Sequence, residues 1–148
     1  MKNKSFVLVG MILTLLAGIL NGQSVVEIRA AASTAVSGWQ QMASPNGQAL
    51  WVSPSTSLTS ADIDRAEAAT SADAGPGINL VLTDSGAKKM ADLSASQSNK
   101  PIALLLDGHV IWAPVVRGSI GKQVRLTGGD GGLTQGQIDR LLTSFKQK

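Results

Sequence analysis

The chain has 148 residues, of which 43% are hydrophobic, and it carries 13 basic side chains, 10 acidic side chains and no cysteine. The lack of cysteine excludes disulfides, thiolate nucleophiles and cysteine-ligated metal sites. Two of the basic side chains, Lys2 and Lys4, stand at the N-terminus, so the rest of the chain is almost neutral and gives no electrostatic reason to expect a nucleic-acid partner.

An uncharged, mainly apolar run over residues 6–20 follows these lysines, in the pattern of a secretory signal. At about 1.5 Å of rise per residue, the run is shorter than the roughly 30 Å hydrocarbon core of a bilayer, which favours a signal peptide over residues 1–22. After Lys4 no charge appears before Glu27, so an uncleaved membrane anchor through residues 6–26 is the alternative. In both cases the sequence predicts an exported protein, in the periplasm or on the outer face of the cytoplasmic membrane.

Residues 23–48 are rich in alanine, serine, glycine and glutamine, which predicts a linker. Apolar residues also recur there at steps of three and four, as on one face of a helix. They are Val25, Ile28, Ala32, Ala35, Trp39 and Met42. The segment is therefore either a flexible linker, which Ser37 and Gly38 favour, or an amphipathic stalk.

Three threonines that each follow a leucine predict the starts of three helices, because a threonine hydroxyl can accept hydrogen bonds from the free amides of a first helical turn. They are Thr59, Thr83 and Thr134. Gln137 adds the second half of a capping box to the third helix. That helix also carries an apolar stripe that needs a core to face, made of Ile138, Leu141, Leu142 and Phe145.

Between these helices, several segments have the periodicity of strands. Residues 50–52 form a short candidate, apolar and other residues alternate over 78–82, and residues 123–127 alternate in the same way. Residues 102–106 are continuously apolar, as expected for a central strand.

The segment after this apolar run predicts a hairpin. Asp107 and Gly108 supply the positive φ angles of a two-residue turn, and residues 110–112 then form the antiparallel partner strand. Pro114 ends the pairing or places it on an edge, because proline has no amide to donate. The predicted order is β-α-β-α-β-β-β-α, which indicates an α+β domain over residues 49–148, with an antiparallel or mixed sheet and helices on one face.

With that order in place, four segments together resemble the head subdomain of the first periplasmic domain of SecD, in the SecDF family. They begin at Leu50 (LWVSPSTSLTSADIDRA), Ile78 (INLVLTDSGAKKMADL), Pro101 (PIALLLDGHVIWAPVVRGSI) and Val124 (VRLTGG). The resemblance implies an α+β domain outside the membrane that engages polypeptide emerging from the Sec channel. The sequence lacks a recognisable bundle of transmembrane helices and the intramembrane carboxylates of a proton-driven engine, so only the part that touches substrate or partner is implied.

Catalytic patterns are weak. His109 is the only histidine, and no nucleophile or orienting group can be assigned to it. Ser85 and Lys88 have S-x-x-K spacing, but the companion motifs of the penicillin-recognising enzymes are missing. The glycine-rich run over residues 128–132 precedes a helix but lacks the lysine of a phosphate loop, and no carboxylate pair or metal cluster emerges. We therefore expect no catalytic residue, no metal and no cofactor.

Trp112 lies on the second strand of the hairpin, where it either packs in the core or is exposed near His109 and Arg117 as an anchor for a partner chain. Trp51 is expected in the core. These observations favour a non-catalytic binding module of the cell envelope that contacts translocating or extended polypeptide or an envelope partner, possible partners including the Sec translocon. The alternative is a structural or oligomerising envelope protein without a role in export, with residues 25–42 as its self-association helix.

Overall fold

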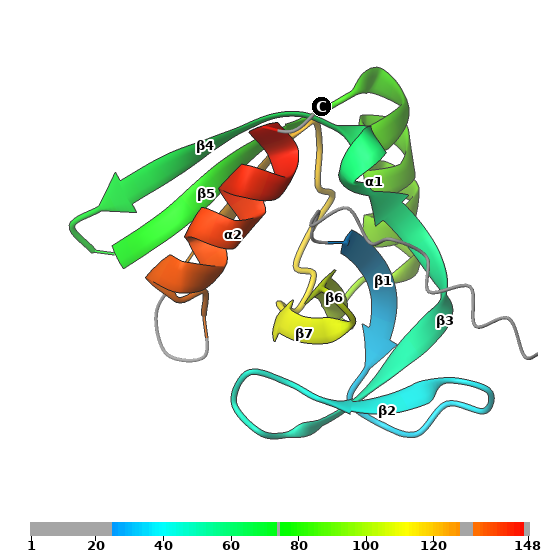
Figure 1. The fold of residues 1–148 in the computed structure, drawn as a ribbon. Coiled ribbons are helices and arrows are strands. Elements are labelled where there is room, and N and C mark those ends of the chain that lie inside the picture. The colour runs from blue at the N-terminus through cyan, green and yellow to red at the C-terminus, as the bar shows by residue number, and fades with distance from the viewer. Residues whose placement is uncertain (1–24, 74, 128–131, 147–148) are drawn as a thin grey trace, which may run out of the picture.

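The computed structural model describes residues 25–73, 75–127 and 132–146 (Figure 1). In chain order the elements are β1 (Val26–Ala32), β2 (Gln40–Ala43), β3 (Ala49–Thr59), a 3-10 turn η1 (Ser60–Asp62), β4 (Ile63–Ser71), β5 (Gly75–Leu82), α1 (Asp84–Ser96), β6 (Ile102–Leu106), β7 (His109–Trp112), β8 (Gln123–Thr127) and α2 (Gln135–Lys146). They form a five-stranded sheet in the order β2-β3-β1-β6-β7 and a three-stranded sheet in the order β4-β5-β8, and every strand pair is antiparallel. The α+β class is confirmed, whereas the element order differs from the predicted one.

Strand β6 lies inside the five-stranded sheet and is buried on both faces, as its continuous apolar run predicts. Ile102, Leu104 and Leu106 point into the main core, which the five-stranded sheet shares with the three-stranded sheet and both helices. Ala103 and Leu105 point to the opposite face, where they join a smaller cluster with residues of β1, β3 and β7. The five-stranded sheet therefore carries two apolar clusters, one on each face.

The second and third predicted helices are present. Thr83 caps α1 by accepting a hydrogen bond from the Gly86 amide at 3.0 Å. At α2 the capping box is complete, because the Gln137 amide donates to Thr134 and the Thr134 amide donates to Gln137. Both helices bury apolar side chains in the main core: Met90 and Leu93 from α1, and Ile138 and Leu141 from α2.

The helix predicted after Thr59 is wrong. Thr59 and Asp62 do form a capping box, but the helical turn they cap is only three residues long. The following residues pair with β5 along almost their whole length as strand β4. A helix over this segment would have had little apolar surface to bury beyond Ile63, whereas the strand joins a ready partner edge.

The linker or stalk predicted over residues 23–48 is also wrong where the structure describes it. Strand β1 pairs with β3 on one side and with β6 on the other. Val26 is 2% exposed and lies in the core, whereas Val25, which the helical spacing would have buried, is 52% exposed. The folded domain therefore includes residues well before 49, and no self-association helix exists over residues 25–42.

The remaining findings concern Trp51, the helices of the described residues, and two predicted segments that lie outside those residues. Trp51, which was expected in the core, is only half-buried on β3 and belongs to neither apolar cluster. Within the described residues, no helix combines the length and the apolar character needed to cross a membrane. The predicted signal over residues 1–22 lies outside the described residues, and so do residues 128–131 of the glycine-rich run.

Candidate functional site

The β6–β7 hairpin forms as predicted, and its turn is anchored from two sides. Asp107 and Gly108 both have positive φ, at 51° and 80°. One carboxylate oxygen of Asp107 accepts a hydrogen bond from the Val25 amide at 2.8 Å, and the other pairs with Arg140 of α2 at 2.5 Å. The turn thus holds together the start of β1, the hairpin and α2.

Strand β7 lies at an edge of the five-stranded sheet. Its only strand partner within the described part of the chain is β6, and an irregularity between Leu104 and Leu105 gives β7 one extra residue, Ile111. Because of this bulge, Val110 and Ile111 are both buried although they are consecutive, Val110 in the smaller cluster and Ile111 in the main core. The strand ends at Trp112, as Pro114 predicts, although the Pro114 carbonyl still accepts a hydrogen bond from the Ile102 amide.

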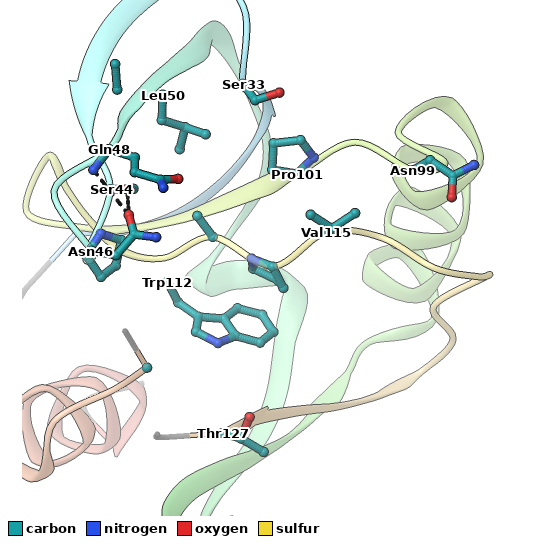
Figure 2. Close-up of a pocket in the computed structure, with 15 residues that line it drawn as sticks. Ser33, Ser44, Asn46, Gln48, Leu50, Asn99, Pro101, Trp112, Val115 and Thr127 are labelled. Carbon is teal, nitrogen blue, oxygen red and sulfur yellow. Dashed lines mark hydrogen bonds between the residues drawn. The ribbon is translucent and has the colours of Figure 1, made fainter. Parts of the chain in front are cut away.

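Beside the end of β7 the surface forms a groove of about 400 Å³ (Figure 2). Segments that are distant in the sequence line it: the turn between β2 and β3, the segment after β7, and residues near the ends of β1, α1 and β8. Figure 2 shows Trp112 between the turn that carries Asn46 and the strand end that carries Thr127. Val115, a large apolar side chain that is 45% exposed, also lines the groove.

The polar side of the groove is a turn over residues 44–48, which the linker or stalk predicted there does not include. The Asn46 carboxamide oxygen accepts one hydrogen bond from the Ser44 hydroxyl and another from the Gln48 amide, the latter at 3.2 Å. Gly47 follows at φ 80°. The sequence Pro45-Asn46-Gly47 is a strong turn signal, and it is the local pattern that identifies this element within residues 23–48.

A second cavity of about 370 Å³ lies along the segment after β7 and shares Trp112, Pro114 and Val115 with the groove. Arg117 lines this second cavity, so the structure brings Trp112 and Arg117 to one hollow. His109 lines neither cavity and is exposed beside the turn. Trp112 is half-buried and packs against the main core, so it combines the two positions that the sequence left open.

The residues examined for catalysis are dispersed. Ser85 is exposed at the start of α1, where its hydroxyl lies 3.2 Å from the Thr83 hydroxyl. Asp84 beside it pairs with Lys122 at 2.7 Å, and this hydrogen bond together with the charge of Lys122 lowers the pKa of Asp84 and raises the pKa of Lys122. In the described ranges, no three histidine, aspartate or glutamate side chains gather as a metal site would require. The groove combines apolar side chains with polar turn groups, and it lies at the end of edge strand β7.

Comparison with known proteins supports the resemblance to the SecD head subdomain. The sequence matches the family described as SecDF, P1 head subdomain, over residues 37–134. SecDF of Brucella abortus biovar 1 (strain 9-941) is 42% identical over 64 residues, which are 43% of this chain and 8% of that protein. SecD of Acidaminococcus fermentans is 39% identical over 74 residues, 49% of this chain and 18% of that protein.

Solved structures of SecDF share the fold. One described as "Crystal structure of SecDF in Super-membrane-facing form" has a TM-score of 0.60 and 23% identity, covering 82% of this chain and 19% of that one. Another, described as "Structure and function of a membrane component SecDF that enhances protein export", has a TM-score of 0.60 and 24% identity, covering 82% of this chain and 63% of that one. The chain spans less than a fifth of the curated relatives it matches. The family match covers more than half of the chain, and the chain therefore belongs to the SecDF P1 head subdomain family.

Proposed function

We propose that this protein is an exported, non-catalytic binding module that holds extended polypeptide during protein export. The observation that carries the proposal is the groove at the end of β7, in which Trp112, Pro114 and the exposed Val115 lie next to the polar turn over residues 44–48. An extended chain presents both apolar side chains and backbone amides. The groove and the adjacent sheet edge match these two kinds of group.

Backbone recognition would occur by strand addition. Edge strand β7 has β6 as its strand partner, so a client segment can pair along its other side in the way that many peptide-binding domains extend a sheet. Side chains of the client would then fall alternately toward and away from the groove. Affinity would come from the backbone, and selectivity from Trp112, Val115 and, in the neighbouring cavity, Arg117.

The relatives support a role in export. They are named as translocase subunits SecD and SecDF, and one SecDF structure is described as that of a membrane component that enhances protein export. We infer that the Sec translocon or a chain leaving it is the partner, on the outer side of the cytoplasmic membrane. The apolar run over residues 6–20 would direct the protein there.

The binding proposal is tested with fluorescein-labelled peptides that are unfolded in solution, using fluorescence anisotropy. Val115→Ser removes the apolar side chain from the groove, and Val25→Ser is a matched control because Val25 has a similar exposure (52%) and lines neither the groove nor the cavity beside it. We expect Val115→Ser to weaken peptide binding by about fivefold, from the loss of roughly 1 kcal/mol of apolar burial, and Val25→Ser to leave it unchanged. Equal binding by the two variants and the parent would contradict a role of the groove.

The link to export is tested in cells. A photo-crosslinking amino acid placed at Val115 should capture a secreted chain while its transfer is stalled, and the same amino acid placed at Glu67 on the three-stranded sheet should not. Capture at both positions or at neither would argue against contact through the groove.

N-terminal sequencing and fractionation of the native protein decide between a signal peptide cleaved near residue 22 and a retained anchor.

A further inference from the structure

The second cavity, which adjoins the groove, differs from it in charge. Its ionisable lining residues within the described part of the chain are two arginines, Arg117 on the segment after β7 and Arg125 on β8. Among the described residues, no aspartate or glutamate lines this cavity, and no ionisable side chain lines the groove. A region of positive charge therefore lies directly beside an uncharged lining.

The charges of the two arginines are not used in the fold. Within the described ranges, neither Arg117 nor Arg125 takes part in an ion pair. Glu67 lies in the same row of the three-stranded sheet as Arg125, but Asn79 of β5 stands between them, and two strand spacings amount to about 10 Å. Glu67 is also already paired with Arg65. Both arginines are therefore available to an acidic group from another molecule.

Both arginines stand on backbone that the fold holds in place. The Val116 amide, just before Arg117, donates to a carbonyl of the connection from α1 to β6 at 2.9 Å. The Ile120 amide, three residues after Arg117, donates to the buried Ser94 hydroxyl of α1 at 3.1 Å. Arg125 lies in the middle of β8, which pairs with β5 along its length. Because the backbone is fixed, a ligand would have to order only the two side chains.

Among the side chains of a polypeptide, a carboxylate suits these arginines best. A guanidinium group can donate two parallel hydrogen bonds to a carboxylate, and such charge-assisted bonds are stronger than those between neutral groups. A lysine or arginine at the same place would be repelled. The cavity shares Trp112, Pro114 and Val115 with the groove, so a polypeptide that lies on these residues brings its neighbouring side chains to the cavity.

We propose that this cavity is a carboxylate site, in which an aspartate or glutamate of the bound polypeptide pairs with Arg117 and Arg125. The inference rests on the proposed function, because the polypeptide in the groove delivers the carboxylate. It adds a substrate class: extended segments in which an acidic residue lies close to apolar residues. Segments with a basic residue at that place are disfavoured.

The test uses labelled peptides that are identical except at one position beside an apolar cluster, which is glutamate, glutamine or lysine. That position is moved one residue at a time away from the cluster, and binding to the full folded chain is measured by fluorescence anisotropy. At the best position, we expect the glutamate peptide to bind about fivefold more tightly than the glutamine peptide, and the lysine peptide to bind more weakly than both. The preference should shrink as the salt concentration rises to about 1 M, where charges are screened beyond about 3 Å.

Two double variants locate the preference. Arg117→Gln with Arg125→Gln removes both charges from exposed positions, so the ratio of the glutamate to the glutamine affinity should fall to about one. Lys88→Gln with Lys146→Gln removes the same net charge from exposed positions on α1 and α2 that line neither the groove nor the cavity, and should leave the ratio at about five. The ratio is taken within each variant, so an overall change in affinity does not alter it.

The outcomes separate the two proposals. If no peptide binds the parent protein, the proposed function fails and the carboxylate site fails with it. If the glutamate and glutamine peptides bind the parent equally at every position, the groove binds polypeptide but the carboxylate site is refuted. A preference that persists without both arginines would also refute it. If the parent sediments with anionic phosphatidylglycerol vesicles and the double arginine variant does not, the arginines serve a lipid headgroup and the assignment is overturned.

Discussion

The two sheets end in edge strands that differ in how they meet solvent. Strand β4, at the edge of the three-stranded sheet, is nine residues long and exposes the charged side chains of Asp64, Arg65 and Glu67. Strand β7, at the edge of the five-stranded sheet, is four residues long, and His109 is its only ionisable side chain. Charged side chains on an edge oppose pairing with another chain. Of these two edges, β4 therefore carries charges that oppose pairing whereas β7 does not, and β7 ends beside the groove.

The largest expected effect concerns how β4 is placed. Gly86 in the first turn of α1 packs directly on the turn that begins β4, since a Cβ atom at Gly86 would lie 2.3 Å from the Asp62 carbonyl oxygen. We expect Gly86→Ala to lower the free energy of unfolding by about 3 kcal/mol, measured by urea denaturation. Gly136→Ala, in the first turn of α2, is the control, because nothing lies within 4 Å of its added Cβ. It should be neutral or stabilising, and similar results for both glycines would refute the contact.

The second effect concerns β7. Gly108 stands at φ 80° in the turn that leads into this strand, and a β-branched residue is strained there. We expect Gly108→Val to lower the free energy of unfolding by about 1 to 3 kcal/mol. Gly118→Val is the matched control, because Gly118 lies at a loop position without positive φ and with open space around the added Cβ. The stability of both variants is measured by thermal denaturation. If Gly108→Val were as stable as the control, the turn would tolerate a β-branched residue at this position and the predicted strain would be refuted.

A third experiment removes charged side chains from the edge strand β4. Arg65 and Glu67 form an exposed ion pair at 3.3 Å, which contributes only about 0 to 1 kcal/mol to stability. Replacing both with threonine should therefore leave the melting temperature almost unchanged but promote concentration-dependent self-association, seen by sedimentation velocity. Lys88→Thr with Asp92→Thr removes the same charges from the exposed face of α1 and should stay as monomeric as the parent. Equal behaviour of the two double variants would show that the charges do not protect the edge.

The smallest effect is a pH dependence at the start of α1. Lys122 lowers the pKa of Asp84 below the ordinary value of 3.8, so this pair stabilises the fold above that value and its contribution is lost as the pH falls through the folded-state pKa. In the same pair the pKa of Lys122 is raised above 10.5, so the contribution is also lost as the pH rises through that higher pKa. Asp84→Asn should destabilise slightly near neutral pH and make no difference in strong acid, in melts across the acid range. A constant difference at every pH would contradict the linkage.

Several local features followed from neighbouring residues alone. The turn at Asp107 and Gly108, the caps at Thr83 and Thr134, and the alternating strands near Ile78 and Val124 depend on groups only a few positions apart. The Thr59 cap could be predicted from neighbouring residues in the same way, and it is present in the structure. What failed there was the length of the helix, because a cap specifies where a helix begins and says nothing of how far it continues.

The amino-acid sequence by itself therefore determined the hairpin, the caps, the apolar periodicities and the family resemblance, since these depend on short-range geometry and on residue identity. Tertiary structure alone decided that residues 26–32 are a strand, because β1 forms its hydrogen bonds with β6, which lies far along the chain. It also decided the groove, whose lining comes from separate connections of the fold. Short apolar runs suit either a helix or a strand, and the choice falls to the partner that is available to bury them.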